Sequence, residues 1–297
     1  MRYLCVLNPQ AGNKKAAKIK ASIHTLLQEF SFETDWFISQ YPHHAREIFM
    51  KYQPSDYQGI FVIGGDGTLF DIVNAQMNLP NEKRLPLAVI PAGTGNSVYM
   101  DLFGTDPQQI EKSIERVLNN KTKKIDVLQV KTSQKIFYFI NILGFGFTTD
   151  VTRQAVHYKF FGKQAYTLAI LKKLIGLKSY PLLMELKGKK YELHNTFVSI
   201  LNTKYAGGNL LMAPKALHND GLMDVIVVNK LSRWELLKTF PKIYDGSYIE
   251  SPYVDYFQTD KIKFSSPQHK QLSPDGELCQ ELPVEIEVIP EALEFFI

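Results

Sequence analysis

Two different patterns of hydrophobic and polar residues divide the sequence near residue 121. Over the first 120 residues, short apolar runs alternate with segments in which apolar residues recur every three or four positions, as Ile19, Ile23 and Leu27 do. The apolar runs predict strands, and the spaced segments predict helices. Such alternation is typical of an α/β domain whose mostly parallel sheet carries helices on both faces. Strands are predicted at residues 2–8, 34–39, 59–64 and 86–91, and helices at residues 14–30, 43–52, 68–77 and 107–119.

The pattern changes after residue 122, where short strands of alternating polarity are separated by turn residues. These strands predict a mainly antiparallel β-sandwich, interrupted by predicted helices at residues 160–177 and 232–243. The charged connector KTKKID marks the change. We therefore expect one domain over residues 1–123, with the C-terminal tail 290–297 as a candidate addition to it, and a second domain over residues 124–289.

The composition narrows the class of protein. With 297 residues, 45% of them hydrophobic and 22% charged, the chain can bury a substantial core. A formal net charge of +4 is too small to indicate a nucleic-acid-binding protein. Cys5 and Cys279 lie far apart and indicate neither a disulfide framework nor a zinc site, so a reducing compartment is expected. No stretch approaches the roughly 18 apolar residues of a membrane span, and the first apolar run is too short for a signal peptide. We expect a cytoplasmic protein that can still work at a membrane surface.

Three glycine-rich turns follow predicted strands of the first half. They are NPQAGNKK at residues 8–15, GGDGT at residues 64–68 and PAGTGNS at residues 91–97. Parallel sheets place ligands at the carboxyl ends of their strands. Glycine lets the backbone approach a ligand closely, and the unpaired N–H groups at a helix start favour an anion. Phosphate is therefore the candidate ligand.

Two of these turns also have a purely structural interpretation. NPQAG alone is most often an ordinary strand-to-helix turn. In GGDGT, Thr68 would act as a helix N-cap and Asp71 would complete a capping box. That alternative accounts for Thr68, but it leaves Asp66 and two of the glycines unexplained. Because a phosphate ligand accounts for the glycines, we prefer the functional interpretation at this turn.

The order of these motifs resembles one known family. GGDGTLFDIVNA followed by PAGTGN closely resembles the catalytic domain shared by diacylglycerol, sphingosine and ceramide kinases and the bacterial YegS-type lipid kinases. NPQAG resembles the family's first nucleotide-contacting turn, and ISQYPHHAREI resembles its second strand and following helix, with Ser39 where a threonine is usual. FFGKQAYTLAILKKL, APKALHNDGLMDVIVV and SPDGE resemble segments of the family's second domain. The resemblance covers nearly the whole chain and implies the fold of the diacylglycerol kinases and NAD kinases.

The resemblance implies that ATP binds in the cleft between the two domains. Asp66 is too short and too acidic to hold a phosphate directly, so we expect a Mg²⁺ ion that neutralises both groups. The residues expected around the nucleotide are Asn8, Pro9, Gln10, Ala11, Gly12, Ser39, Gly64, Gly65, Asp66, Gly67, Thr68, Asn74 and Thr94.

The turn SPDGE, residues 273–277, resembles the family's catalytic turn. Glu277 is expected to take the proton from the acceptor hydroxyl, because a positioned carboxylate within hydrogen-bond reach can do so. Phosphoryl transfer otherwise needs mostly positioning and charge neutralisation. Asp275 is the second candidate, holding either metal or a neighbouring basic group. Without the upstream motifs, Pro-Asp-Gly would be interpreted as an ordinary β-turn.

A second, structural Mg²⁺ site is implied in the segment KALHNDGLMD. The resemblance assigns to it the side chain of Asp220 and the backbone carbonyls of Leu217 and Leu222. Carboxylate and carbonyl oxygens suit a hard cation. A hairpin turn at Asn-Asp-Gly explains the same letters nearly as well. Lys215 is a candidate neighbour of this loop.

Residues 157–183 mix Phe, Tyr, Leu and Ile with basic residues. This composition suits an apolar face for lipid access with a basic rim toward anionic headgroups, and it equally suits an amphipathic helix packed on the sheet. His43 and His44 are interpreted as a solvated helix start rather than a catalytic pair. The expected partners are ATP, a lipid and, transiently, a membrane surface, with peripheral association during turnover. The oligomeric state is left open, with a homodimer as one option.

We therefore predict an ATP-dependent lipid kinase, with diacylglycerol as the first choice of acceptor and phosphatidic acid as the product. Many bacterial members of the family carry aspartate where this chain has Ser97, so a sphingoid base or ceramide stays open as the acceptor. NAD kinase shares the GGDGT signature, but PAGTGN, SPDGE and the apolar-basic segment argue against it. A catalytically idle lipid- or nucleotide-binding protein is a further alternative, opposed by the joint presence of Asp66, Asp220 and Glu277.

Overall fold

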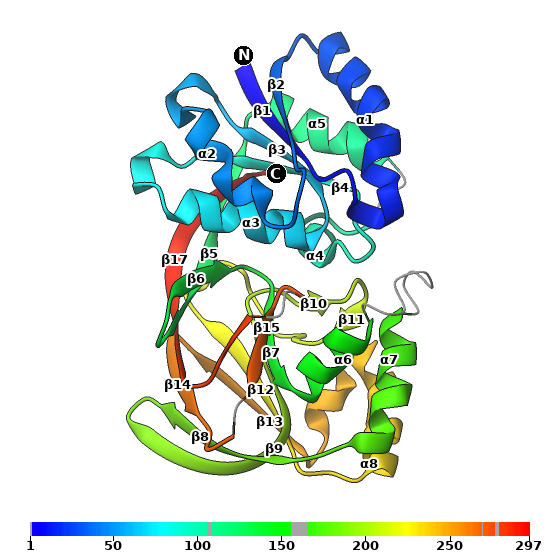
Figure 1. Ribbon diagram of the computed structural model, residues 1–297, viewed down its shortest axis with the longest axis vertical. Coiled ribbons are helices and arrows are strands. Elements are labelled where there is room, and N and C mark those ends of the chain that lie inside the picture. The colour runs from blue at the N-terminus through cyan, green and yellow to red at the C-terminus, as the bar shows by residue number, and fades with distance from the viewer. Residues whose placement is uncertain (1, 106–107, 156–164, 269, 277–278) are drawn as a thin grey trace. The chain divides into compact units, whose positions relative to one another are not determined.

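The computed structural model describes residues 2–105, 108–155, 165–268, 270–276 and 279–297 (Figure 1). The chain forms two compact units, one of residues 1–126 and 290–297 and the other of residues 127–289. It passes from one unit to the other twice, in strand β5 (Thr122–Thr132) and in strand β17 (Val284–Phe296).

A parallel sheet forms the centre of the first unit. β1 pairs with β2 on one side and β3 on the other, and β4 pairs with β3, all in parallel. The end of β17 adds a parallel pairing in which Phe295 lies opposite Leu87 of β4. β3 and β4 are buried along their whole length, as expected for strands covered on both faces. The strands are β1 (Arg2–Leu7), β2 (Glu33–Ile38), β3 (Ile60–Gly64) and β4 (Leu87–Pro91).

Helices cover both faces of this sheet. On one face, the rings of Tyr3, Phe32 and Phe61 meet with centroids 5.1 to 5.7 Å apart, beside Ile23 of α1. Elsewhere in the unit, α3 is buried from Thr68 to Met77. This arrangement confirms the predicted α/β domain. The helical segments are α1 (Ala11–Glu29), η1 (His44–Glu47), α2 (Ile48–Lys51), η2 (Pro54–Asp56), α3 (Asp66–Met77), η3 (Asn81–Lys83), α4 (Ser97–Phe103) and α5 (Gln109–Asn119).

The second unit is an antiparallel β-sandwich, as predicted. Its long strand β9 pairs with β7, β8 and β12, and β15 extends the sheet from β7. β14 joins β8 to the first half of β17. Besides β5 and β17, the strands are β6 (Ile136–Phe139), β7 (Ile142–Gly146), β8 (Tyr180–Leu186), β9 (Lys189–Leu201), β10 (Tyr205–Ala206), β11 (Leu210–Leu211), β12 (Met223–Asn229), β13 (Val254–Thr259), β14 (Lys261–Ser265), β15 (Gln271–Pro274) and β16 (Cys279–Glu281).

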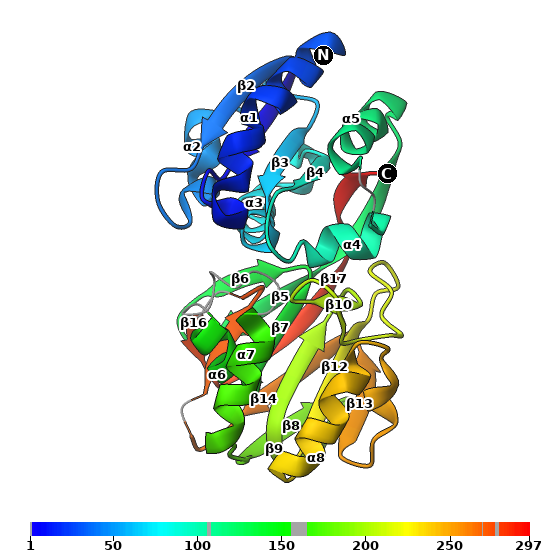
Figure 2. The same cartoon turned by 90° about the vertical axis from the view of Figure 1, so that its right-hand side faces the viewer.

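The helices of the second unit pack on one apolar cluster. α6 and α7 lie next to each other (Figure 2). Ile170 of α7 and Leu236 of α8 are buried in the same cluster as Phe197 of β9. None of the described helices combines the length and the apolar composition of a membrane-spanning segment. The helical segments are α6 (Phe147–Ala155), α7 (Ala165–Lys173), η5 (Leu174–Gly176), α8 (Arg233–Thr239), η6 (Phe240–Ile243) and η7 (Ser247–Glu250).

Several helices differ from the predicted elements. The predicted helix at residues 43–52 is two short turns, η1 and α2, and the predicted helix at residues 160–177 is described only from residue 165 onward. α6 was not predicted. Its sequence FTTDVTRQA is rich in β-branched residues, which have low helix propensity. Tertiary packing on the β-sandwich therefore outweighs local preference in α6.

Candidate functional site

The three glycine-rich turns meet at the carboxyl edge of the parallel sheet in the first unit. The backbone N–H of Asn8 donates to the carbonyl of Ile63 at 3.1 Å. The carbonyl of Gly64 accepts from the N–H groups of Ala92 and Gly93 at 2.8 and 3.1 Å. These bonds tie the ends of β1, β3 and β4 together. The turns at residues 8–15, 64–68 and 91–97 are therefore neighbours in space, although more than 20 residues separate each from the next along the chain.

The glycines in these turns are required by backbone-to-backbone packing. A Cβ atom on Gly65 would lie 2.9 Å from the Cα of Gly93. The atom that it would meet belongs to the backbone, so no flexible side chain could move to make room. A Cβ on Gly12 would overlap the carbonyl oxygen of Ala92, and Gly12 has a φ of +59° that favours glycine. The residue after it, Asn13, also has a left-handed backbone. The glycine pattern thus has a structural cause in addition to the phosphate role that the sequence predicts.

Asp66 holds the second turn to the start of α4. Its two carboxylate oxygens accept from the backbone N–H groups of Ser97 and Val98, at 3.0 and 3.3 Å. Burial raises the pKa of Asp66, and these N–H groups oppose that shift by favouring the carboxylate. The side chain of Ser97 and the backbone of Asn96 also form hydrogen bonds with this carboxylate and favour its charged form. The side chain that seemed unexplained in the sequence therefore has structural partners at the start of α4.

The capping-box alternative for GGDGT is wrong. The residue at the N-cap of α3 is Gly65, and no side chain caps this helix. Thr68 is buried, and its hydroxyl accepts a hydrogen bond from the side-chain amide of Asn8 at 3.2 Å. This bond links the first turn to the second.

Asp71 has partners that the sequence did not indicate. Its carboxylate accepts from the Nε of Arg46 at 2.7 Å and lies 2.9 Å from the Nδ1 of His43. His43 is an exposed residue at the start of η1, as the sequence predicts, and it also contacts α3. It has a left-handed backbone and faces α3. The contact connects the segment after β2 to the helix that follows GGDGT.

The remaining residues predicted around the nucleotide have different surroundings. Ser39 follows β2 and donates its N–H to the carbonyl of Leu7 at 2.9 Å. Asn74 is buried within α3, where its amide donates to the carbonyl of Phe70. Thr94 is exposed in the third turn.

Hydrogen bonds of Asn8 shape the first turn. Its carboxamide oxygen accepts from the N–H of Gln10, and its backbone carbonyl accepts from the N–H of Ala11. These bonds shape the chain through Pro9, Gln10 and Ala11. Gly64 is the last residue of β3, and Gly67 lies in the first turn of α3.

In the second unit, the turn that follows β15 is pinned to β7. Asp275 has a φ of +45°, donates its N–H to the carbonyl of Ile142 at 2.7 Å, and accepts from the N–H of Ile142 at 2.9 Å. Asp275 therefore shapes the predicted catalytic turn through its own side chain. Glu277, the predicted proton acceptor, lies outside the described residues.

An apolar pocket of about 120 Å³ lies beside this turn. Ser273 and Gly276 form part of its wall, so the SPDGE segment borders the pocket directly. The rest of the wall comes from β7, β9, β10, β11 and the helices around them: Ile142, Gly144, Phe147, Thr148, Val151, Thr152, Ile170, Phe197, Ala206, Gly207, Leu210, Met212, Leu236, Phe240 and Ile243. The sequence did not predict this pocket, because its wall is drawn from segments spread over more than 130 residues.

The loop of the predicted second metal site is exposed. Asp220 accepts from the N–H of Leu222 at 3.0 Å, which is the geometry of a tight turn at Asn-Asp-Gly. Leu217 is exposed in the same loop. Within the part of the chain that the structure describes, no group of three His, Cys, Asp or Glu side chains could hold a metal. The predicted ligand set has only one such side chain, together with two backbone carbonyls, so this finding does not test it. The second metal site stays a prediction.

Asp224 is a buried carboxylate that the sequence analysis missed. It accepts hydrogen bonds from the hydroxyl of Tyr256 and from the amide of Gln258. Burial raises the pKa of Asp224 to about 6, and the nearby charge of Asp220 acts in the same direction. Lys215 lies over the ring of Tyr256, 5.3 Å from its centroid. The second acid of the segment NDGLMD was the only signal in the sequence for this group.

We expect Gly65→Ala to destabilise the first unit by about 1–3 kcal/mol, because its Cβ would push against Gly93. Gly65 has a φ of −112°, which alanine adopts freely, so the effect isolates the close approach of the two turns. Guanidinium unfolding followed by the fluorescence of Trp36, in a Trp234→Phe background, measures it. Gly176→Ala is the matched control, since its Cβ would meet open space. Equal stability of the two variants would refute the packing argument.

Two family models together match most of the chain. Residues 2–130 match the diacylglycerol kinase catalytic domain, and residues 141–297 match the YegS C-terminal NAD kinase beta sandwich-like domain. The two matches correspond closely to the two units of the structure.

Named relatives and a solved structure agree with these matches. A probable lipid kinase YegS-like of Shewanella frigidimarina is 32% identical over 81% of this chain and 77% of its own length. A diacylglycerol kinase of Mycobacterium tuberculosis is 27% identical, covering 99% and 94% of the two chains. Sphingosine kinase 1 of Arabidopsis thaliana is 24% identical over 93% of this chain and 66% of its own length. The crystal structure of a putative diacylglycerol kinase from Bacillus anthracis has the same fold, with a TM-score of 0.81 at 22% identity over 99% of this chain and 96% of that one. The protein thus belongs to the diacylglycerol kinase-like family of lipid kinases.

Proposed function

We propose that this protein transfers the γ-phosphate of ATP to the hydroxyl of a lipid, with diacylglycerol as the acceptor and phosphatidic acid as the product. The observation that carries the proposal is the apolar pocket walled in part by the SPDGE turn. An acyl chain in that pocket would keep the lipid's polar end beside the turn that holds Glu277. A water-soluble acceptor would gain little from such a wall.

The first unit supplies the features expected of a phosphate site. The turns at residues 8–15, 64–68 and 91–97 meet at the carboxyl edge of a parallel sheet, where such sheets bind ligands. Their glycines leave backbone groups uncovered by side chains, as an anion site requires. We propose that these turns contact the phosphates of ATP, with the other predicted residues of the first unit around them.

The carboxylates of the chain fit magnesium at two places. Mg²⁺ would neutralise the charge on the transferring phosphoryl group. Asp66 would hold the ion that accompanies the nucleotide, because its carboxylate is fixed between the second turn and the start of α4. Asp220 would hold a second, structural ion with the carbonyls of Leu217 and Leu222, and its carboxylate is exposed to receive one. Glu277 would accept the proton of the lipid hydroxyl.

The other candidate acceptors differ in how well they suit this apolar pocket. A sphingoid base or ceramide also carries a long apolar chain, and one relative of this chain is named a sphingosine kinase. NAD carries two aromatic rings but no long aliphatic chain, so it gains less from an extended apolar wall than a lipid does. Diacylglycerol is preferred because relatives named diacylglycerol kinase match almost the whole chain.

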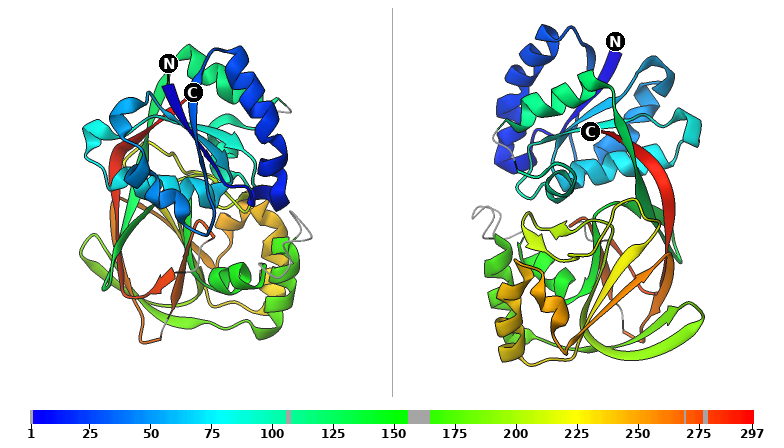
Figure 3. Two further views of the ribbon diagram at one scale, coloured as in Figure 1. Left: turned by 45° about the horizontal axis from the view of Figure 1, so that its top comes forward. Right: turned by 180° about the vertical axis from the view of Figure 1, so that it is seen from behind.

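A surface on the second unit supports peripheral association with a membrane. Trp234 of α8 and Ile175 of η5 are 74% and 73% exposed, and both segments pack on the same apolar cluster. The right-hand view of Figure 3 shows α7 and α8 along the same edge of this unit. Lys172 and Arg233 are exposed beside these apolar side chains. Exposed aromatic and aliphatic side chains with basic neighbours suit an anionic lipid interface. We propose that a cytoplasmic protein binds the membrane with this surface during turnover.

The proposed activity is tested with γ-labelled ATP, Mg²⁺ and a panel of diacylglycerol, sphingosine, ceramide and NAD. We expect label in diacylglycerol, and Glu277→Gln should lower the rate by about 10²–10⁴-fold while ATP still binds, because only proton transfer is removed. Glu192→Gln, an exposed carboxylate of β9, is the matched control. Label in NAD alone would contradict a lipid acceptor, and no label in any acceptor would favour an idle binding protein. Unchanged turnover of Glu277→Gln would remove that residue from its role.

We expect Ala206→Leu to raise the KM for the lipid acceptor by about tenfold, because the larger side chain fills part of the apolar pocket. The KM for ATP should not change. Steady-state kinetics with each substrate varied in turn measures both values. If the lipid KM stays constant while the variant remains folded, the pocket is not the acceptor site.

We expect the emission of Trp234 to shift to shorter wavelength when anionic vesicles are added, because its indole would leave water for the lipid interface. Trp36→Phe makes Trp234 the single tryptophan of the chain. Neutral phosphatidylcholine vesicles serve as the control for the basic residues. An emission maximum that is unchanged by anionic vesicles would place the membrane contact elsewhere.

A further inference from the structure

A second pocket of about 170 Å³ lies on the other side of α6 from the apolar pocket, and its wall is polar. Thr149, Asp150 and Arg153 share one face of α6 at helical spacing, whereas Phe147 and Val151 lie on the face that borders the apolar pocket. The opposite wall comes from β8 and β15. The residues that line this polar pocket are Gly146, Thr149, Asp150, Arg153, Tyr180, Lys270 and Gln271.

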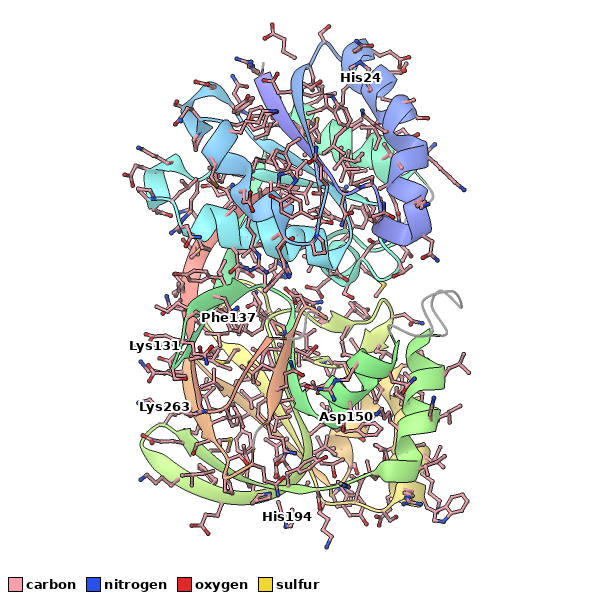
Figure 4. The ribbon with its side chains drawn as sticks, in the orientation of Figure 1. His24, Lys131, Phe137, Asp150, His194 and Lys263 are labelled. Carbon is pink, nitrogen blue, oxygen red and sulfur yellow. The ribbon has the colours of Figure 1, made fainter. Side chains whose placement is uncertain are left out.

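The polar pocket carries two cationic side chains and one anionic side chain. Arg153 donates to the carboxamide oxygen of Gln271 at 2.6 Å and lies 3.6 Å from the carboxylate of Asp150. Asp150 and Arg153 project from the same helix, and Figure 4 labels Asp150 on α6. The carboxylate of Asp150 lies beside Arg153 and offsets its positive charge. The three charged side chains of the pocket therefore sum to one positive charge, which corresponds to Lys270.

Lys270 is the group that most needs an anion. Its ammonium lies over the ring of Tyr180, and no ion pair with a carboxylate is formed by Lys270 among the described residues. Burial lowers the pKa of Lys270, and the nearby charge of Lys178 lowers it further, while Asp150 raises it. A cation that has lost water and faces a second cation is stabilised by a bound anion.

We propose that the polar pocket between α6 and β15 binds a phosphate group. The guanidinium of Arg153 and the ammonium of Lys270 are the side chains that recognise phosphate in proteins. The amide of Gln271 and the hydroxyl of Tyr180 line the same pocket and can donate hydrogen bonds. With one carboxylate in its wall, this pocket lacks the ligands that a divalent cation requires. The phosphate is supplied either as a soluble anion or as the headgroup of an anionic phospholipid.

A phosphate at this position would brace the wall that the two pockets share. Arg153 belongs to α6, and Lys270 precedes β15 by one residue. Thr149 already joins these elements, since its hydroxyl donates to the carbonyl of Gln271 at 3.0 Å. Ser273, two residues further along β15, lines the apolar pocket. The bound anion therefore stabilises α6 and β15 where they border the other pocket.

The proposal is tested with the full chain and four proteins: wild type, Lys270→Gln, Asp150→Asn and Lys189→Gln. One arm titrates inorganic phosphate by isothermal calorimetry, and the other measures co-sedimentation with phosphatidylglycerol vesicles. Lys270→Gln should weaken binding by about tenfold or more, since a charge-assisted hydrogen bond is lost. Asp150→Asn should strengthen it, because the opposing charge is removed and Arg153 is released. Lys189→Gln alters an exposed lysine of the same unit and should bind as wild type does.

The two arms distinguish the source of the phosphate. Opposite effects of Lys270→Gln and Asp150→Asn in the calorimetric arm assign a soluble anion, and the same pair of effects in the vesicle arm alone assigns a lipid headgroup. Equal binding by all four proteins in both arms would overturn the proposal. No binding by wild type in either arm, up to about 10 mM phosphate, would also overturn it. Neither arm contains ATP or a lipid acceptor, so its result is independent of the kinase assay.

Discussion

The close approach of Gly65 to Gly93 is the constraint on which the first unit depends. Two backbone segments pass so near one another that a Cβ atom added to one glycine would meet the Cα of the other. That approach is possible because the carbonyl of Gly64 binds the N–H groups of Ala92 and Gly93 and draws the ends of β3 and β4 together. The first turn joins them through Asn8, whose amide donates to Thr68. Phosphate binding, in the function we propose, would use the backbone that this packing leaves uncovered.

Asp66 shows how one side chain can serve the fold and the proposed chemistry together. Its carboxylate is held by two N–H groups at the start of α4, so its position is set before any ligand arrives. In the function we propose, a carboxylate fixed in this way could receive a Mg²⁺ ion without rearranging. In the second unit, Asp275 plays a comparable part, because it pins to Ile142 the turn that precedes Glu277.

α6 divides the second unit into two chemical environments. One of its faces borders an apolar wall suited to a lipid chain, and the other carries Asp150 and Arg153 into a polar pocket. β15 is shared in the same way, with Ser273 toward the apolar pocket and Gln271 toward the polar one. A helix of β-branched residues can hold this arrangement because α7, β7, β9 and β15 pack against it.

The class of fold and the positions of the three turns could be predicted from the sequence. Apolar periodicity separates an α/β half from a β half, and glycine-rich turns after strands of a parallel sheet must lie at its carboxyl edge. These signals depend on residues close together in the sequence, so they can be recognised without an alignment of related proteins. The contacts between distant side chains could not be predicted in this way. They include His43 and Arg46 on Asp71, Tyr256 on Asp224, and the walls of the two pockets around α6. Each of these contacts joins segments that lie apart in the sequence. A local sequence pattern does not specify which distant side chain a residue will contact after folding.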